Sequence, residues 1–74
     1  MTPTQCRAAR ALVDISQAQL SGIAVVPRIV IEEFEAGLAM PSEDELYAMR
    51  IVLEWADVEF TEGDDPGVRL RKDG

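Results

Sequence analysis

The chain is 74 residues long, which suits one small domain whose hydrophobic core is marginal in size. Seven Lys and Arg stand against fourteen Asp and Glu, and the net charge of −7 disfavours long-range attraction to nucleic acid or membrane surfaces. Histidine is absent and Cys6 is the only cysteine, so His/Cys metal sites, cysteine–histidine catalysis and an intramolecular disulfide are excluded.

The first predicted helix begins after Thr2. Thr2 is a suitable N-cap, Pro3 fits the first turn, and Gln5 stands at the position that completes a capping box. Apolar residues follow at helical spacing, namely Cys6, Ala9, Leu12 and Val13. Cys6 is therefore expected to be a small buried residue of this helix.

Ser16 and Gln19 form a second capping box, which predicts a short helix carrying Ala18 and Leu20. Residues 22–26 are then expected to be a turn, although they contain little turn chemistry.

Pro27 is placed as the first residue of a third helix. Val30, Ile31 and Phe34 give this helix a narrow apolar stripe, and Gly37 is expected to supply a left-handed C-terminal cap.

A third capping box, Ser42 with Glu45, opens the longest predicted helix, which runs from Ser42 to Ala56. The residues expected to face inward are Leu46, Met49, Val52 (or Leu53) and Ala56.

Two alternating runs follow residue 57, one carrying Val58 and Phe60 and the other Val68 and Leu70. The Gly/Asp/Pro segment 62–67 between them predicts a β-hairpin. A two-stranded hairpin is marginally stable alone, so it must pack on the helices, pair with a second copy or fray. The predicted organisation is a helical domain over residues 1–57, a hairpin extension over 58–71 and a tail over 72–74.

Two short helices, a turn and a third helix ending at glycine describe a helix-turn-helix arrangement. Its signature residues are Ser16, Gln17 and Leu20 in the second helix, Ile31, Phe34, Glu35 and Gly37 in the third, and then Pro41. With these residues the chain resembles the lambda-repressor-like (XRE/Cro/CI-type) family, and its flanks 5–12 and 58–70 resemble a subgroup of short bacterial regulators. The resemblance covers nearly the whole chain.

The resemblance implies an all-α domain of four to five helices with a short C-terminal β-hairpin. It also implies a transcriptional regulator that binds double-stranded DNA as a homodimer, with the third helix in the major groove. The residues that it would bring to DNA are Gln17, Pro27, Arg28, Ile29 and Glu32. Gln17 would touch a phosphate, and Arg28 a base or a phosphate.

Several residues depart from the family pattern. Val25 stands where the family usually has a turn glycine, and a β-branched residue resists positive φ, so the turn is either strained or built differently. Pro27 has no N–H to offer a phosphate. Other departures are Val30 for Ser or Thr, Ile29, Glu32 and Glu33 for Arg, Lys, Gln or Asn, and Leu38, Ala39 and Met40 for basic residues.

These departures favour an alternative in which the third helix binds a protein instead of DNA, as an antiactivator or a regulator-binding module does. An acidic and apolar surface would then face a basic partner. The residues of this alternative are Ile29, Glu32, Glu33, Leu38, Met40 and Trp55.

Four side chains have a structural interpretation beside the functional one. Arg28 is placed to pair with Glu32 at i+4, and the amide of Gln17 could be solvated beside a helix cap. Glu35 is expected to make a structural hydrogen bond or salt bridge. Trp55 is expected to be an anchor in the core or in a dimer interface.

The sequence offers no enzyme chemistry. Carboxylate pairs occur at Glu32-Glu33 and Asp64-Asp65, but no nucleophile–base pair accompanies them, and the second pair is typical of a turn. We expect no cofactor and no metal. A single cysteine, the absence of a membrane-length apolar run and an N-terminus unlike a signal peptide predict a cytoplasmic chain without a membrane partner.

Overall fold

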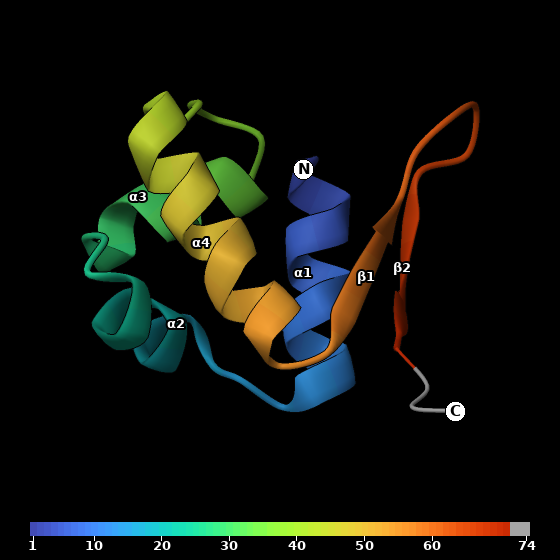
Figure 1. Ribbon diagram of the computed structural model, residues 1–74. Coiled ribbons are helices and arrows are strands. Elements are labelled where there is room, and N and C mark those ends of the chain that lie inside the picture. Colours follow the sequence, from blue (N-terminus) through green and yellow to red (C-terminus); the bar gives the residue numbers. More distant parts are fainter. Residues whose placement is uncertain (72–74) are drawn as a thin grey trace.

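The computed structural model describes residues 1–71, and the predicted tail over 72–74 lies outside the described residues. Four helices precede an antiparallel hairpin, as predicted (Figure 1). The elements are α1 Pro3–Val13, α2 Gln17–Ala24, α3 Arg28–Glu35, α4 Glu43–Trp55, β1 Val58–Thr61 and β2 Gly67–Leu70. The fold is therefore a mostly helical small domain with one hairpin.

Three of the helices begin with the capping boxes that the sequence predicts. The side chains of Thr2, Ser16 and Ser42 each accept a hydrogen bond from the backbone N–H three residues later. In return the side chain of that third residue accepts from the N-cap backbone, so two unpaired donors of each helix are satisfied. These local bonds fix where α1, α2 and α4 start.

The second helix is longer than the sequence predicts. The sequence predicts a turn over residues 22–26, but residues 22–24 continue α2 to Ala24, and only Val25–Pro27 connect it to α3. The helix ends where Val25 adopts the left-handed conformation, with φ 57° and ψ 48°. Of the two expected alternatives, the turn is therefore the strained one, because a β-branched residue occupies the left-handed region.

The third helix begins one residue later than predicted and ends as predicted. Pro27 is the N-cap, with an extended ψ of 137°, and not the first helical residue. At the other end Gly37 has φ 75°. The N–H of Leu38 reaches Glu33 O at 2.8 Å and that of Gly37 reaches Phe34 O at 3.0 Å, a Schellman motif that closes the helix.

One core joins the four helices to the first strand. Its largest fully buried members are Phe34, Leu20, Ile31, Met49, Leu53 and Val58. Val52 and Leu53 are both buried, whereas Leu46 and Ala56 are only partly buried. Trp55 is 78% exposed, so of the two places expected for it the core is wrong, and the dimer interface stays a prediction. At about 100° per residue, Trp55 lies about 160° around the helix axis from Leu53 and about 120° from Met49, so it turns away from most of the buried side.

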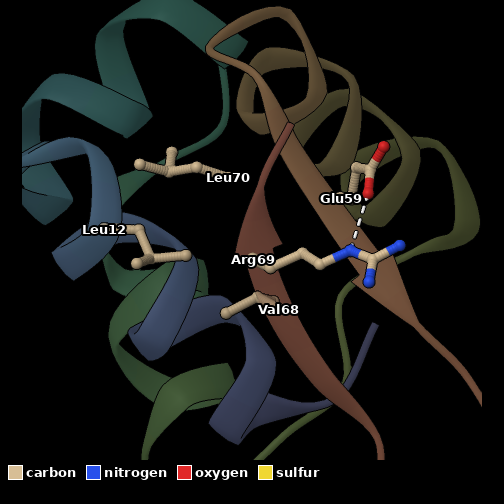
Figure 2. A pocket seen from close by; sticks show the side chains of 5 residues that line it. All are labelled: Leu12, Glu59, Val68, Arg69 and Leu70. Carbon is tan, nitrogen blue, oxygen red and sulfur yellow. Dashed lines mark hydrogen bonds and ion pairs between the residues drawn. The ribbon is translucent and has the colours of Figure 1, made fainter. Parts of the chain in front are cut away.

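The hairpin packs against α1 (Figure 1). Its register pairs Val58 with Leu70 and Phe60 with Val68, and Figure 2 shows Val68 and Leu70 beside Leu12 of α1, with Glu59 and Arg69 on the other face. Of the three predicted outcomes, packing on the helices is the one observed. The hairpin therefore extends the same core and is not a separate unit.

Candidate functional site

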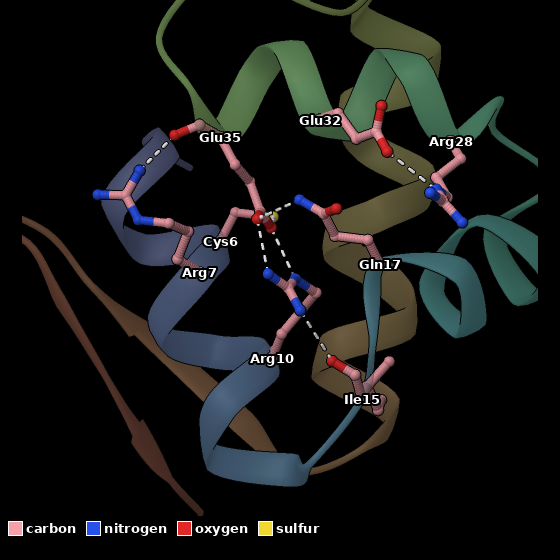
Figure 3. A network of polar contacts seen from close by, with 8 residues as sticks. All are labelled: Cys6, Arg7, Arg10, Ile15, Gln17, Arg28, Glu32 and Glu35. Atoms are coloured by element: carbon pink, nitrogen blue, oxygen red, sulfur yellow. Dashed lines mark hydrogen bonds and ion pairs between the residues drawn. The ribbon is translucent and has the colours of Figure 1, made fainter.

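The structure places the predicted site residues in four locations. Gln17 lies in a buried polar cluster, Arg28, Ile29, Glu32 and Glu33 lie on α3 after the exposed Pro27, Leu38 and Met40 lie in the loop that follows, and Trp55 lies on α4. The cluster joins α1, α2 and α3 around the carboxylate of Glu35 (Figure 3). We call four residues the α3 face: Ile29, Glu32 and Glu33 of α3, and the exposed Val25 of the turn that precedes it.

Glu35 is a structural residue, as predicted. Its side chain is 4% exposed and accepts from Arg10 Nη2 at 2.6 Å, Arg10 Nε at 2.7 Å, Gln17 Nε2 at 2.9 Å and Cys6 Sγ at 3.1 Å. Burial raises the pKa of the Glu35 carboxyl. The hydrogen bonds from Arg10, Cys6 and Gln17 together lower this pKa by more than burial raises it, so the net pKa is below its usual value. Glu35 is therefore a buried anion that ties three helices together.

Gln17 is part of this cluster. The sequence suggested either a phosphate contact or a solvated amide beside a helix cap. Its amide instead points toward Glu35 and donates a hydrogen bond to Oε1 (Figure 3). The solvated-amide interpretation is therefore wrong, and a phosphate contact through this N–H would require Gln17 to leave a buried carboxylate.

Arg28 forms the predicted i+4 ion pair with Glu32, with Nε 2.9 Å from Oε2 (Figure 3). Both partners remain accessible, with side chains 62% and 36% exposed. Arg28 is the only cation between residues 16 and 40, a segment that also contains Glu32, Glu33 and Glu35. The pair therefore neutralises the one positive charge of α2, the turn and α3.

The α3 face is apolar and acidic. Val25 is 86% exposed and Ile29 is 56% exposed, while Glu33 is exposed beside Glu32. The loop that follows α3 adds two further apolar side chains, Leu38 and Met40, which are 76% and 70% exposed. Large apolar side chains left in water beside a predicted binding helix are typical of a protein interface.

The remaining arginines of residues 1–71 are also engaged. Arg7 donates to the backbone oxygen of Glu35 and to Thr4 Oγ1. Ion pairs join Arg50 to Glu54, and Arg69 and Arg71 to Glu59. No arginine of this part of the chain is thus held unpaired over the α3 face.

Sequence reasoning missed two polar contacts that position these elements. Gln5 was expected only in a capping box, but its Nε2 also donates to Thr61 O at 2.9 Å and Gly67 O at 3.0 Å in the hairpin. Arg7 caps the C-terminal end of α3, where a cation opposes the helix dipole. The spacing of Arg7 and Arg10 by three residues was the available signal that α1 offers one basic edge to an acidic partner.

Comparisons with known proteins add nothing on function. Neither the scan against protein-family models nor the search of curated proteins found a match to this chain. Over residues 1–71, no helix is long and apolar enough to cross a membrane. Nor does that range contain a group of three His, Cys, Asp or Glu side chains that could hold a metal ion. The homodimer implied by the resemblance stays a prediction.

Proposed function

We propose that the chain is a small helix-turn-helix regulator of transcription, of the lambda-repressor-like type, that acts by binding a protein through its α3 face. The observation that carries this proposal is the Arg28–Glu32 ion pair at 2.9 Å, because it leaves α3 without an unpaired positive charge. The partner surface is basic and partly apolar, complementary to Glu32, Glu33, Val25 and Ile29.

The arrangement of the second and third helices supports the helix-turn-helix part of the proposal. α2 and α3 are each eight residues long and are joined by three residues, and their buried side chains Leu20, Ile31 and Phe34 share one core. α3 keeps its opposite side exposed, as a recognition helix does. The fold thus presents a docking helix, and its side chains decide what docks.

The charge of α3 favours a protein partner over DNA. Affinity for DNA comes largely from phosphates neutralised by Lys and Arg, and a specific domain usually makes several such contacts. On its exposed side α3 offers Arg28 against Glu32 and Glu33, since Glu35 is buried and paired with Arg10. A glutamate accepts from cytosine N4, but Glu33, which has no ion pair within residues 1–71, would oppose binding near phosphates. An apolar and acidic helix therefore fits a basic protein surface better.

DNA binding through the same helix is the second candidate, and the exposure of Arg28 favours it. Its side chain is 62% exposed at the start of α3, where recognition helices contact bases. An exposed i,i+4 ion pair contributes only about 0.3–0.5 kcal/mol, so a phosphate could replace Glu32 as the partner of Arg28.

A titration distinguishes the two candidates. Fluorescent duplexes from the region upstream of the chain's own gene, and a random duplex, are titrated at about 50 mM salt, where phosphate contacts are strong. The proposal expects no saturable binding by the wild type or by Arg28→Glu. Sequence-dependent binding that Arg28→Glu abolishes would overturn it in favour of the DNA-binding candidate.

The protein partner is tested by capture with matched baits. Wild type and Ile29→Asp, which changes the α3 face, are compared with Leu70→Asp, which makes the same kind of change on the hairpin, where Leu70 is 47% exposed. Wild type and Leu70→Asp should retain one common protein that Ile29→Asp loses. Binding is then repeated with the captured protein and each bait purified, and equal binding by the wild type and both variants would exclude the α3 face.

A further inference from the structure

The exposed side of α4 carries an apolar stripe that the core does not use. Tyr47, Ile51 and Trp55 follow one another at intervals of four residues, so they share one side of the helix, which faces away from the buried Met49 and Leu53. Tyr47 is 67% exposed, Trp55 is 78% exposed and Ile51 is partly exposed. We call Tyr47, Ile51 and Trp55 the α4 face.

This exposure is costly for so small a domain. The chain has four aromatic residues, one Trp, one Tyr and two Phe, and two of the four stand in water on the α4 face. Single exposed apolar side chains are ordinary, but an exposed row of apolar side chains marks an interaction surface. Eight residues of α-helix extend the stripe over about 12 Å, roughly two turns of a docked helix.

A hollow beside Tyr47 adds shape to this surface. It has a volume of about 220 Å³ and is lined by Met1, Glu43, Leu46, Tyr47 and Arg50. Its wall is mainly apolar, and an apolar side chain of a partner would bury Leu46, which the domain itself covers only in part. The α4 face therefore combines flat aromatic rings with a place for one inserted side chain.

The margin of the α4 face is acidic. Glu43 and Asp44 open the helix, and the ion pairs within residues 1–71 include neither of them. Glu54 and Asp57 lie at the other end. The one cation of α4, Arg50, is 3.1 Å from Glu54 and lies 5.1 Å from the centre of the Phe60 ring, so it is committed within the domain.

This charge pattern disfavours a second copy of the chain as the occupant. An antiparallel pair of α4 helices would place Glu43 and Asp44 of one copy beside Glu54 and Asp57 of the other. A parallel pair would place each of these acidic residues beside the same residue of the other copy. Each copy also has a net charge of −7, so the two would repel each other. Ridges of residues four apart pack well against another helix, so the complementary occupant is a helix that carries apolar and basic side chains.

We propose that the α4 face is a second docking site, which binds an amphipathic helix with apolar side chains along one side and Lys or Arg along its flanks. The site goes beyond the function proposed for α3 and uses none of the residues of the α3 face. The chain thereby gains two separate surfaces for protein contact.

Trp55 provides a direct readout, because it is the only tryptophan of the chain and stands in the proposed site. The probe is a synthetic helical peptide of about five turns, without Trp, with Leu at i, i+4 spacing and Lys and Arg on the flanks. Saturable binding should move the emission of Trp55 to shorter wavelength as the indole leaves water. A peptide with Glu for each Lys and Arg, and a scrambled peptide of the same composition, should leave it unchanged.

Variants keep this test specific. Ile51→Asp should weaken binding of the basic peptide by about tenfold or more, because it places a charge in the centre of an apolar contact. Ile29→Asp, on the α3 face, should bind as the wild type does, so loss of one proposed site is distinguishable from loss of the other. Circular dichroism checks that both variants fold.

Three outcomes would overturn the proposal. They are an equal response to the scrambled peptide, no change in Trp55 emission with any peptide, and a blue shift that depends on protein concentration alone together with a dimer in sedimentation. The last result would assign the α4 face to a second copy.

Discussion

The guanidinium of Arg10 on α1 donates two hydrogen bonds to the carboxylate of Glu35 on α3, at 2.6 and 2.7 Å. Gln17 of α2 donates to the same carboxylate, so one buried anion connects the three helices that frame the turn (Figure 3). The position and tilt of α3, and therefore of any partner it binds, depend on this cluster.

Replacing Glu35 by Gln should destabilise the domain severely. The variant leaves the Arg10 guanidinium, whose side chain is 19% exposed, facing a neutral amide. Breaking a buried ion pair on one side usually costs about 3–5 kcal/mol, a large share of the stability of a small domain. Urea unfolding measures the loss. Glu33→Gln, the same change at an exposed site of α3, should stay within about 0.5 kcal/mol of wild type. Similar losses in both variants would contradict the role of Glu35.

The contribution of Glu35 should disappear in acid. Because its pKa is lowered in the folded state, the stabilisation is complete above the unfolded pKa of about 4.3 and is lost as pH falls through the folded pKa. The gap in unfolding free energy between wild type and Glu35→Gln should therefore be constant from about pH 7 to about pH 5 and shrink below about pH 4. A gap that persists unchanged to about pH 2 would show that the carboxylate charge contributes nothing.

The side chain of Gln5 should hold the hairpin on α1. Its Nε2 donates to the Thr61 and Gly67 carbonyls, while its Oε1 accepts from the Thr2 backbone at 2.8 Å. Gln5→Glu keeps the capping acceptor but turns a carboxylate toward two carbonyl oxygens. Leaving buried polar groups unsatisfied costs about 1–3 kcal/mol. Amide hydrogen exchange should therefore accelerate in β1 and β2.

The control for this prediction is Gln19→Glu, at the same capping-box position of α2. Its Oε1 accepts from Ser16 N at 2.9 Å, and the residue is exposed. Glutamate serves that acceptor role equally well, so this variant should keep wild-type exchange in the hairpin. Protection of β1 and β2 that survives in Gln5→Glu would show that apolar packing alone docks the hairpin.

What the sequence predicts in this fold is what depends on near neighbours. The capping boxes, the Gly37 cap and the Arg28–Glu32 pair each join residues a few positions apart, so residue type and spacing suffice. The bond from Gln17 to Glu35 joins residues 18 apart and those of Gln5 join residues 56 and 62 apart, so they depend on packing that no local pattern encodes. The spacing of Trp55 leaves its place open in a related way. It lies three residues from Val52 and two from Leu53, at the margin of the buried side, where size and hydrophobicity suggest either the core or an interface.

Replacing Val25 by Gly should raise the stability of the domain and weaken the binding proposed for the α3 face. The Val25 φ of 57° places a β-branched side chain in the left-handed region, at a cost of about 1–2 kcal/mol, and its 86% exposure means that little packing is lost on removal. Val25→Gly relieves that strain, less the greater backbone entropy of glycine in the unfolded chain. The expected net gain is about 0.5–1 kcal/mol, with Tm rising by about 2–8 °C.

The same substitution removes an apolar side chain from the α3 face, so binding of the protein partner should weaken while the domain becomes more stable. Val25→Ala is the matched control, because it trims the side chain but leaves a Cβ in the left-handed conformation. It should weaken binding as well and bring little of the thermal gain. A lower Tm for Val25→Gly would mean that the valine stabilises the turn, and unchanged partner binding would place Val25 outside the interface. Gain of stability with loss of binding would explain why a strained valine stands at this turn.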